Sequence, residues 1–273
     1  MSSIMRSSRG VIHADHPWVD AELAWVYDTL SSPYDEDLPW YSDLTTRLHG
    51  RVLELACGSG RLLVPIAQAG NEAVGLDVSP DMLELAHQKL ACASPSVAER
   101  VRLVQGDMRT FALGETFDLA IIAARSFCYL ITRADQQRTL AAVAAHLRPG
   151  GLLALDLLNP TPTWLLEPPG SLRQDLVHYD SVRDLTIART ETVVSTDFAA
   201  QVRMTRSAYE VVANDGSVTK RFVEWPYRYT YRFEAELLLE QAGFEVAGVY
   251  GGYQREPFSS WSKWLVMLAR RNE

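Results

Sequence analysis

Between residues 51 and 157, short apolar runs alternate with segments whose apolar residues recur at helical spacing. The apolar runs have the length of buried strands and cover 51–56, 72–76, 101–105, 117–123 and 151–157. The helical segments between them cover 61–69, 79–90 and 134–147. Strands joined by amphipathic helices form βαβ units, whose parallel sheet is buried on both faces. The alternation therefore predicts a doubly wound, Rossmann-like α/β fold.

The alternation stops near residue 160 and resumes near residue 233. The residues between carry three or four β-like runs, such as TIARTETVV, QVRMTRSAYEVV and TKRFVEWPYRYTY. The sequence NDGS at 214–217 predicts a hairpin turn between two of these runs. In the last run, alternate residues share one face by their period of two: Val223, Trp225, Tyr227, Tyr229 and Tyr231. We therefore expect an antiparallel β insertion at 161–232, as a substrate cover or a homodimer contact.

Both ends of the chain add elements to this plan. After the insertion, a helix at 233–242 and strands at 244–250 and 263–269 complete a seven-stranded sheet. At the start, a short flexible tail leads to a helix at 17–30, which includes Trp18, and to a second helix that ends near Leu48. The expected division is an N-terminal helical lid at 1–45, a core at 46–160 and 233–273, and the insertion at 161–232.

The charge and residue composition restrict the classes of partner that this chain is expected to bind. The 273 residues contain 26 Lys and Arg against 34 Asp and Glu, so the formal net charge is −8. A surface of this sign repels phosphate backbones, and we expect no nucleic-acid partner. The sequence has no apolar run of about 18 residues, so we expect no transmembrane helix. The three cysteines and six histidines show no metal-type spacing. We expect a reduced, cytoplasmic protein with no metal and no membrane partner.

Ligand-binding residue types follow three of the expected strands. The run Glu54–Gly60 reads ELACGSG and joins the first strand to the first helix. Its glycines permit close approach of a ligand to the backbone, although a turn that binds nothing is the alternative reading. Asp77 ends the second strand and suits a ribose diol, while Asp107 and Met108 follow the third strand and suit an adenine ring. Open α/β sheets bind ligands at this carboxyl edge.

The glycine pattern separates two kinds of nucleotide site. A dinucleotide site has the pattern GxGxxG, whose third glycine permits close helix packing. Here Leu63 stands at the third position, and Glu54 places an acid where a pyrophosphate would lie. An acid is better matched to a cationic ligand such as the sulfonium amino acid of S-adenosylmethionine (SAM). An NAD-type oxidoreductase remains as the disfavoured alternative.

With these motifs in order, the chain resembles the class I SAM-dependent methyltransferases. The resemblance rests on ELACGSGR, GLDVSPDMLELA, GDMRTF and LRPGGLLALDL, and it covers about 45–160 and 233–270. It implies that Glu54, Ala56, Gly58 and Gly60 line the methionine end of SAM. It also implies that Asp77 and Val78 hold the ribose and that Asp107 and Met108 hold the adenine.

Within this class, the chain is similar to small-molecule enzymes, including amino-sugar N,N-dimethyltransferases and glycine N-methyltransferase-like proteins. The shared features are the Tyr27-Asp28 pair, the GDMR run, the β-rich insertion and the C-terminal GGYQREPFSSWSKWLVMLARR. Some amino-sugar enzymes have His where Tyr129 stands in this chain. The Asn/Asp-Pro-Pro-Tyr motif of base-methylating enzymes is absent after the fourth strand, and Asn159-Pro160 follows the fifth strand instead.

Methyl transfer from a sulfonium needs alignment and exclusion of water more than it needs a dedicated base. We expect Arg125 and Tyr129 to act at the reacting centre, with a surface ion pair and a packing aromatic as their alternative roles. Ser126, Asn159, Tyr27 and Tyr34 are the other expected contacts of a small-molecule acceptor that is methylated on nitrogen or oxygen. A SAM- or S-adenosylhomocysteine-binding protein with another role is the second alternative. Cys57 and Cys128 are expected to be small buried hydrophobes.

Overall fold

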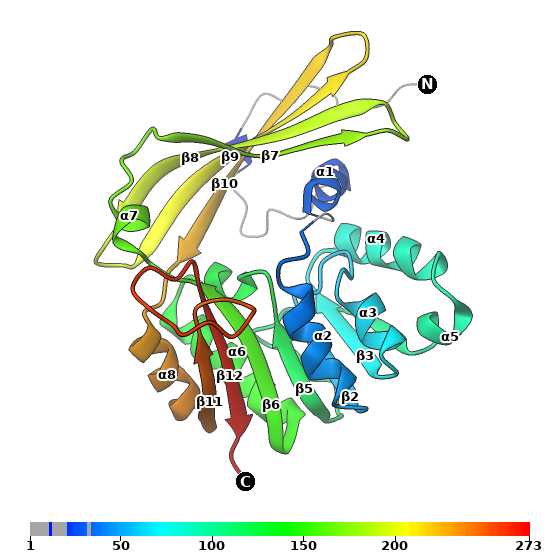
Figure 1. Ribbon diagram of the computed structural model, residues 1–273, viewed down its shortest axis with the longest axis vertical. Helices are drawn as coiled ribbons and strands as arrows, with labels where there is room; N and C mark the ends of the chain where they lie inside the picture. The colour runs from blue at the N-terminus through cyan, green and yellow to red at the C-terminus, as the bar shows by residue number, and fades with distance from the viewer. Residues whose placement is uncertain (1–10, 13–20, 32–33) are drawn as a thin grey trace. The chain divides into compact units, whose positions relative to one another are not determined.

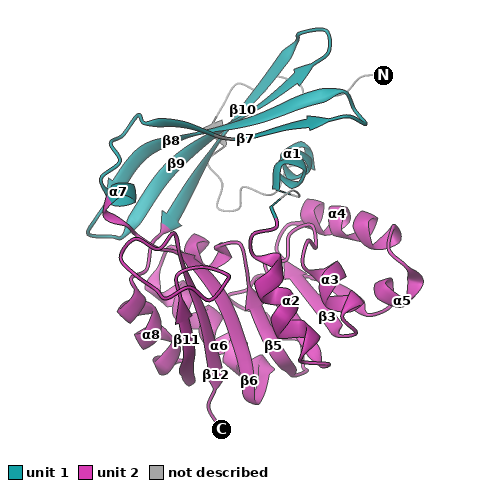
Figure 2. Cartoon of the chain, in the orientation of Figure 1, with its two compact units in different colours: residues 1–34, 163–227 teal, residues 35–162, 228–273 magenta. Residues whose placement is uncertain are grey.

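The computed structural model describes residues 11–12, 21–31 and 34–273. The chain forms two compact units (Figure 2). Unit 1 comprises residues 1–34 and 163–227, and unit 2 comprises residues 35–162 and 228–273. Unit 2 is therefore formed by two segments of the chain, and residues 163–227 of unit 1 lie between them in the sequence.

Unit 2 is built on a seven-stranded sheet with the order β11-β12-β6-β5-β2-β3-β4 (Figure 1). The strands are β2 (Arg51–Leu55), β3 (Glu72–Asp77), β4 (Val101–Gln105), β5 (Phe117–Ile122), β6 (Leu147–Leu158), β11 (Phe244–Tyr250) and β12 (Trp264–Arg271). Strands β2 to β6 pair in parallel, and β12 pairs antiparallel with both β6 and β11. This arrangement confirms the predicted doubly wound fold.

Helices flank this sheet, and most of their bounds match the expected ones. They are α2 (Leu38–Thr46), α3 (Leu63–Gln68), α4 (Pro80–Ala91), α5 (Pro95–Ala98), α6 (Arg133–His146) and α8 (Arg232–Gln241), together with the 3-10 helix η1 (Ser126–Tyr129). The helix predicted at 61–69 begins at Leu63, because the residues before it form tight turns. The strand predicted at 151–157 begins at Leu147, and a register shift opposite β5 accommodates this longer start. None of the described helices is long and apolar enough to cross a bilayer.

Two serines precede proline-initiated helices and differ in capping. The Ser79 hydroxyl accepts a 3.2 Å hydrogen bond from the Met82 N–H at the start of α4, whereas the Ser94 side chain makes no cap bond at α5. We expect Ser79→Ala to lower the free energy of unfolding by about 1 kcal/mol, the usual cost of an N-cap. Ser94→Ala is the matched control and should be nearly neutral. Urea denaturation of both variants measures the difference, and equal effects would contradict the capping role.

Unit 1 contains a five-stranded sheet with the order β1-β10-β9-β8-β7. Its elements are β1 (Val11–Ile12), α1 (Ala21–Ser31), α7 (Pro162–Leu165), β7 (Leu172–Asp180), β8 (Leu185–Asp197), β9 (Val202–Ala213) and β10 (Val218–Arg228). The predicted turn at 214–217 joins β9 to β10, with Gly216 at a φ of 81°. Helix α1 packs against β7 and β8, and the Arg183 guanidinium lies 4.8 Å from the centre of the Trp25 ring.

Two sequence expectations for this part of the chain need correction, and a third lies partly outside the described residues. Residues 11–12 pair in parallel with β10, so this part of the expected flexible tail is a strand. The helix predicted at 17–30 is observed as α1, and Trp18 lies outside the described residues. Strand β10 ends at Arg228, so the predicted single face does not extend to Tyr229 and Tyr231, which are 1% and 47% exposed. Alternation by two requires continuous extended backbone, and it therefore stops where the strand stops.

Candidate cofactor and acceptor site

The order of the strands creates a switch point in the sheet of unit 2. From β2 the chain builds outward through β3 and β4, and then returns to the other side of β2 to form β5 and β6 (Figure 1). The connections that leave β2 and β5 therefore diverge at the carboxyl edge. This is where open α/β sheets bind ligands. Apart from Tyr27 and Tyr34, the residues singled out in the sequence lie at the ends of β2, β3, β4, β5 and β6 or directly after them.

The turn after β2 has three residues in left-handed conformations. Their φ angles are 53° at Ala56, 54° at Gly58 and 76° at Gly60. Space above Gly58 is open, because a Cβ added there would meet no atom within 4 Å. The backbone at Gly58 is therefore accessible to a ligand, as the ELACGSG run predicts.

Leu63, which replaces the third glycine of a dinucleotide motif, is accommodated from the neighbouring strand. Gly75 in β3 has no side chain, and a Cβ there would lie 2.5 Å from Leu63 Cδ1 and 2.9 Å from Cys57 Sγ. The close approach of α3 to the sheet therefore depends on Gly75. The sequence pattern alone does not reveal that a glycine in β3 provides the space that a third glycine at position 63 would otherwise give.

Asp77 connects the turn to the start of α4. Its Oδ2 accepts a 2.8 Å hydrogen bond from the Gly58 N–H, and its Oδ1 accepts a 2.9 Å bond from the Ser79 N–H. The residue is 6% exposed, and burial raises the pKa of its carboxyl while the backbone hydrogen bonds to Ser79 and Gly58 lower it. A carboxylate has about four acceptor positions. Asp77 therefore keeps capacity for the two hydroxyl groups of a ribose.

Glu54 is a buried acid with an unsatisfied oxygen. It is 3% exposed, and Oε2 has no hydrogen-bond partner among the described residues. Burial raises its pKa to about 8; the charge of Arg61 opposes this rise, and Asp37 and Asp77 add to it. Arg61 is held in turn by two hydrogen bonds of 2.7 and 2.6 Å to the carboxylate of Asp37. This buried acidic group fits a cationic ligand, which would pair with Oε2 of Glu54 and favour the ionised form of its carboxyl.

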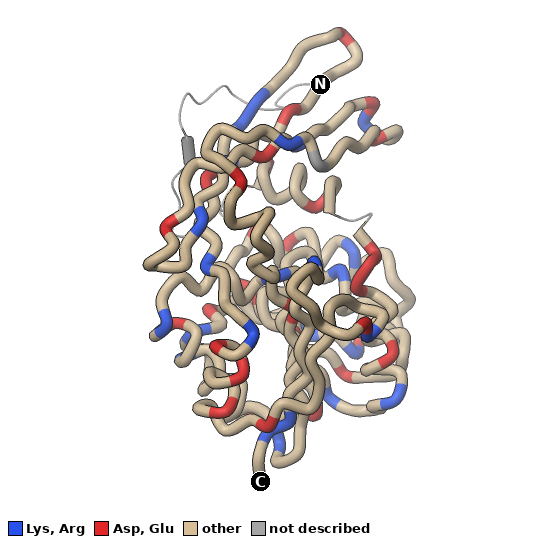
Figure 3. Tube along the Cα trace, turned by 60° about the vertical axis from the view of Figure 1, so that its left-hand side comes forward, with Lys and Arg blue, Asp and Glu red and all other residues tan. Residues whose placement is uncertain are grey.

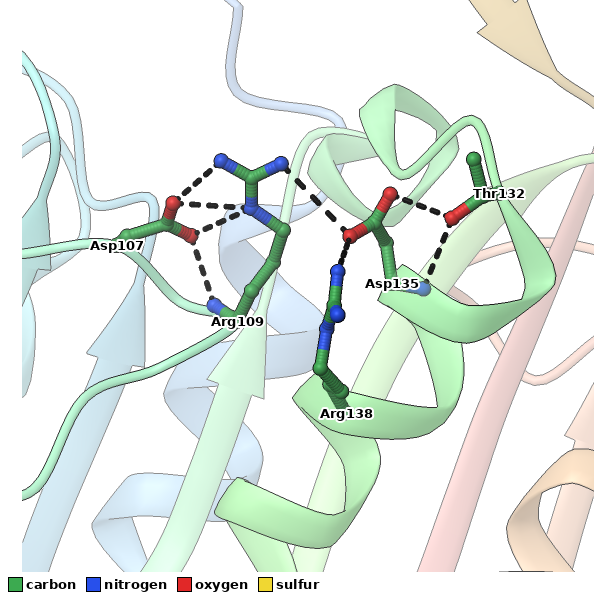
Figure 4. A network of polar contacts seen from close by, with 5 residues as sticks. All are labelled: Asp107, Arg109, Thr132, Asp135 and Arg138. Carbon is green, nitrogen blue, oxygen red and sulfur yellow. Dashed lines mark hydrogen bonds and ion pairs between the residues drawn. The ribbon is translucent and has the colours of Figure 1, made fainter.

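Asp107, after β4, is held by its own neighbour (Figure 4). Its carboxylate accepts from the backbone N–H, Nε and Nη2 of Arg109, with Nη2 to Oδ2 at 2.5 Å. Arg109 Nη1 also lies 3.7 Å from Asp135 Oδ1, and Asp135 accepts hydrogen bonds from Thr132 and Arg138. The hydrogen bond from Thr132 is the main cause of the lowered pKa of Asp135. Arg109 thus fixes the orientation of the predicted adenine acid, and the predicted site did not include it.

The residues after β5 form a second left-handed turn. Ala124 and Arg125 have φ angles of 54° and 61°, and η1 begins at Ser126. The Arg125 guanidinium lies 4.5 Å from the centre of the Trp264 ring, and the Ser126 hydroxyl donates to the Ala123 carbonyl at 2.7 Å. Tyr129 is the last residue of η1 and is half-buried.

The sequence is similar to a family of known proteins and to several individual relatives. Residues 52–151 match a family model described as a methyltransferase domain. A cypemycin N-terminal methyltransferase of Streptomyces is 28% identical over 82% of this chain and 84% of that relative. A dTDP-3-amino-3,4,6-trideoxy-alpha-D-glucopyranose N,N-dimethyltransferase of Streptomyces venezuelae is 29% identical over 74% and 78%. The chain spans 53% of the Bacillus subtilis protein YqeM, with 36% identity over 138 residues.

A solved structure adds the cofactor. The SAM-bound amino pentose methyltransferase CalS10 of Micromonospora echinaspora is 28% identical, with a TM-score of 0.65 over 85% of this chain and 92% of that chain. The sheet order, the turn after β2 and the similarity to these proteins all indicate a SAM-dependent methyltransferase. Residues 52–151 form a methyltransferase domain, and unit 2 has the class I SAM-dependent methyltransferase fold. Its cofactor is therefore SAM, and the alternative of an NAD-type oxidoreductase is set aside.

Several predicted site residues of this methyltransferase have structural partners. Asn159, after β6, is 9% exposed and donates from Nδ2 to the Ser262 carbonyl at 2.7 Å. The amide therefore anchors the loop before β12, and its contact with an acceptor stays a prediction. Tyr27 in α1 and Tyr34 belong to unit 1, so their contact with the acceptor also stays a prediction.

The two cysteines near the methyltransferase site are inert in character. Cys57 is 5% exposed and Cys128 is 1% exposed. Burial raises the pKa of Cys57 well above its usual range and that of Cys128 to about 11. Since the thiolate is the reactive form, these thiols are small buried hydrophobes, as predicted.

One group at this edge escaped the sequence analysis. Asp156 in β6 is fully buried and accepts hydrogen bonds from the hydroxyls of Tyr41 and Tyr253 and from the Arg125 N–H. The available signal was an acid inside the apolar run GLLALDLL. A charged residue in such a run has to be paired, because an unpaired charge in an apolar core is costly.

Proposed function

We propose that this enzyme methylates an amino nitrogen of a small polar metabolite of the amino-sugar class. Glu54 carries the proposal on the cofactor side, because it is a buried acid with an unsatisfied oxygen beside an open left-handed turn. The acceptor class is supported by the N,N-dimethyltransferase and amino pentose methyltransferase relatives. Figure 3 shows Lys and Arg interspersed with Asp and Glu along the trace, which fits a small acceptor better than a polyanion.

The proposed cofactor contacts follow the three strand ends. Glu54, Ala56, Gly58 and Gly60 hold the methionine end, Asp77 and Val78 the ribose, and Asp107 and Met108 the adenine. The bound cofactor supplies a methyl group on a positively charged sulfur. The chain supplies alignment of the acceptor and exclusion of water. An amine needs only to be deprotonated before it attacks, so this reaction makes small demands on a general base.

On the acceptor side, Arg125, Ser126 and Tyr129 lie in one short segment after β5, the strand beside β2. Residues at the ends of β2, β3 and β4 would hold the cofactor, and this neighbouring segment would meet the acceptor that takes its methyl group. We propose that Arg125 and Tyr129 orient the acceptor, with Asn159, Tyr27 and Tyr34 as further contacts. The insertion at 161–232 is proposed to close over the acceptor or to form a homodimer contact.

The first test is analytical. Mass spectrometry of the purified protein should detect co-purified S-adenosylhomocysteine, which indicates turnover, and radiolabelled SAM should transfer methyl to dTDP-amino-sugar acceptors. A dTDP-sugar with hydroxyl in place of the amine is the matched negative substrate. Tight SAM binding without transfer to any amine or hydroxyl acceptor would favour a SAM-binding protein with another role.

The second test concerns the residues after β5. We expect Arg125→Ala and Tyr129→Phe to keep SAM affinity within about twofold, and to lower turnover or raise the acceptor KM by roughly tenfold each, the effect of about 1.4 kcal/mol. Calorimetry and steady-state kinetics measure the two quantities. Arg133→Ala, at the exposed start of α6, is the control. Full activity of both variants on the true acceptor would remove this assignment.

A further inference from the structure

Asp156 forms a buried hydrogen-bonded centre that the reaction described above does not use. The side chain is 0% exposed. Its Oδ1 accepts from the Tyr41 hydroxyl at 2.9 Å, and its Oδ2 accepts from the Tyr253 hydroxyl at 2.9 Å and from the Arg125 N–H at 3.0 Å. Burial raises the pKa of the carboxyl, while Arg125 and the two hydroxyl hydrogen bonds lower it.

The three donors come from segments that are far apart in the sequence. Tyr41 lies in α2, Tyr253 lies in the loop between β11 and β12, and Arg125 lies in the turn after β5. Asp156 itself lies in β6, which runs between β5 and β12 (Figure 1). Both tyrosines are buried, with 1% and 5% of their surfaces exposed. One carboxylate therefore joins the N-terminal part, the middle and the C-terminal part of unit 2.

The turn held by this carboxylate has an unfavourable backbone. Ala124 and Arg125 are consecutive non-glycine residues with positive φ angles of 54° and 61°. A left-handed backbone conformation is unfavourable for a residue with a Cβ. Such a conformation persists where surrounding contacts fix it. The turn is followed at once by η1, which carries Ser126 and Tyr129. The conformation at Ala124 and Arg125 therefore sets where these side chains lie.

We propose that Asp156, with Tyr41 and Tyr253, acts as a positioning centre that holds the left-handed turn at Ala124–Arg125 and thereby places Arg125, Ser126 and Tyr129 for the acceptor. Asp156 acts through the Arg125 N–H and is not a catalytic residue. The consequence for turnover rests on the methyl transfer proposed above, whereas the effect on the turn does not.

The chemistry of the centre favours a carboxylate over an amide. All three partners are donors as arranged, and a carboxylate offers acceptors on both oxygens. An asparagine in this place has one oxygen, and the tyrosine hydroxyl that faces its NH2 group would have to turn round and accept a hydrogen bond. Asp156→Asn therefore keeps the shape of the side chain but replaces hydrogen bonds to a charged group by weaker neutral ones.

Hydrogen–deuterium exchange tests the effect on the turn without any acceptor. In Asp156→Asn, amides of residues 123–130 should exchange at least tenfold faster than in the wild type, while peptides from α4 keep their rates. Calorimetry with S-adenosylhomocysteine should give an affinity within about twofold of the wild type. Tyr253→Phe removes one donor and keeps the fold, and it should give a smaller acceleration in the same peptides.

Rescue tests whether the effect on turnover passes through the turn. Asp156→Asn should lower kcat on a dTDP-amino-sugar at least tenfold. Adding Ala124→Gly removes the Cβ from a left-handed residue. The double variant should have a kcat at least threefold higher than that of Asp156→Asn alone. Tyr250→Phe is the matched control, because Tyr250 is a neighbouring tyrosine outside the Asp156 cluster, and it should leave exchange at 123–130 unchanged.

The outcomes separate this positioning centre from general stability. Unchanged exchange at 123–130 in both Asp156→Asn and Tyr253→Phe overturns it, as does a collapse of S-adenosylhomocysteine affinity in both. Accelerated exchange without rescue by Ala124→Gly also overturns it, since the loss would then not pass through the turn. Failure of the wild type to methylate any acceptor would instead contradict the proposed function, and the exchange result would still decide the role of Asp156 at the turn.

Discussion

Asp77→Ala is expected to weaken SAM binding by roughly a hundred-fold or more. A hydrogen bond to a charged group contributes about 1.5–3 kcal/mol, and a ribose diol would make two such bonds with the carboxylate. The same substitution leaves the N–H groups of Gly58 and Ser79 without their 2.8 and 2.9 Å acceptors. The turn after β2 then loses its anchor, so the loss includes the methionine end as well as the ribose.

Calorimetric titration with SAM and S-adenosylhomocysteine measures this effect. Asp81→Ala is the matched control, since Asp81 lies four residues further along in the first turn of α4, and its affinity should stay within twofold of the wild type. Circular dichroism confirms that both variants are folded. Wild-type affinity in Asp77→Ala would remove the ribose assignment.

Proton-linked binding at Glu54 is the second large expected effect. Its pKa is raised to about 8, so the carboxyl is mostly protonated at pH 7 without ligand. A cationic ligand favours the ionised form, and SAM binding should release close to one proton at pH 7. The association constant should therefore rise as pH increases toward 8, by up to about tenfold per pH unit, and level off above that range.

The sign for stability follows from the same shift. A carboxyl whose pKa is raised on folding contributes most below its usual pKa, and this contribution is lost as pH rises toward about 8. Glu54→Gln should therefore become more stable than the ligand-free wild type as pH rises from 5 to 8. Thermal denaturation across this range gives the measurement.

Calorimetry in buffers of different ionisation enthalpy counts the released protons. Glu54→Gln should bind SAM with little dependence on buffer or pH, whereas Glu84→Gln, the same change at an exposed position of α4, should behave as the wild type. A buffer-independent binding enthalpy in the wild type at pH 7 would contradict the role of Glu54.

Features that depend on neighbouring residues could be predicted from the amino-acid sequence. Alternating apolar runs fixed the strands of the core, because a buried parallel strand and an amphipathic helix have different periods. Short-range chemistry also placed Ser79 at the start of α4 and the turn at 214–217. The motif ELACGSG predicted the open left-handed turn after β2, since glycine tolerates positive φ.

Features that depend on residues far apart in the sequence became visible only in the folded chain. Tyr41 and Tyr253 meet at Asp156 although more than two hundred residues separate them, and no local pattern encodes that meeting. Gly75 makes room for Leu63 across two elements, and residues 11–12 join the edge of β10. Hydrogen bonding and close packing act over a few ångströms in space, whereas propensity and periodicity act over a few residues along the chain.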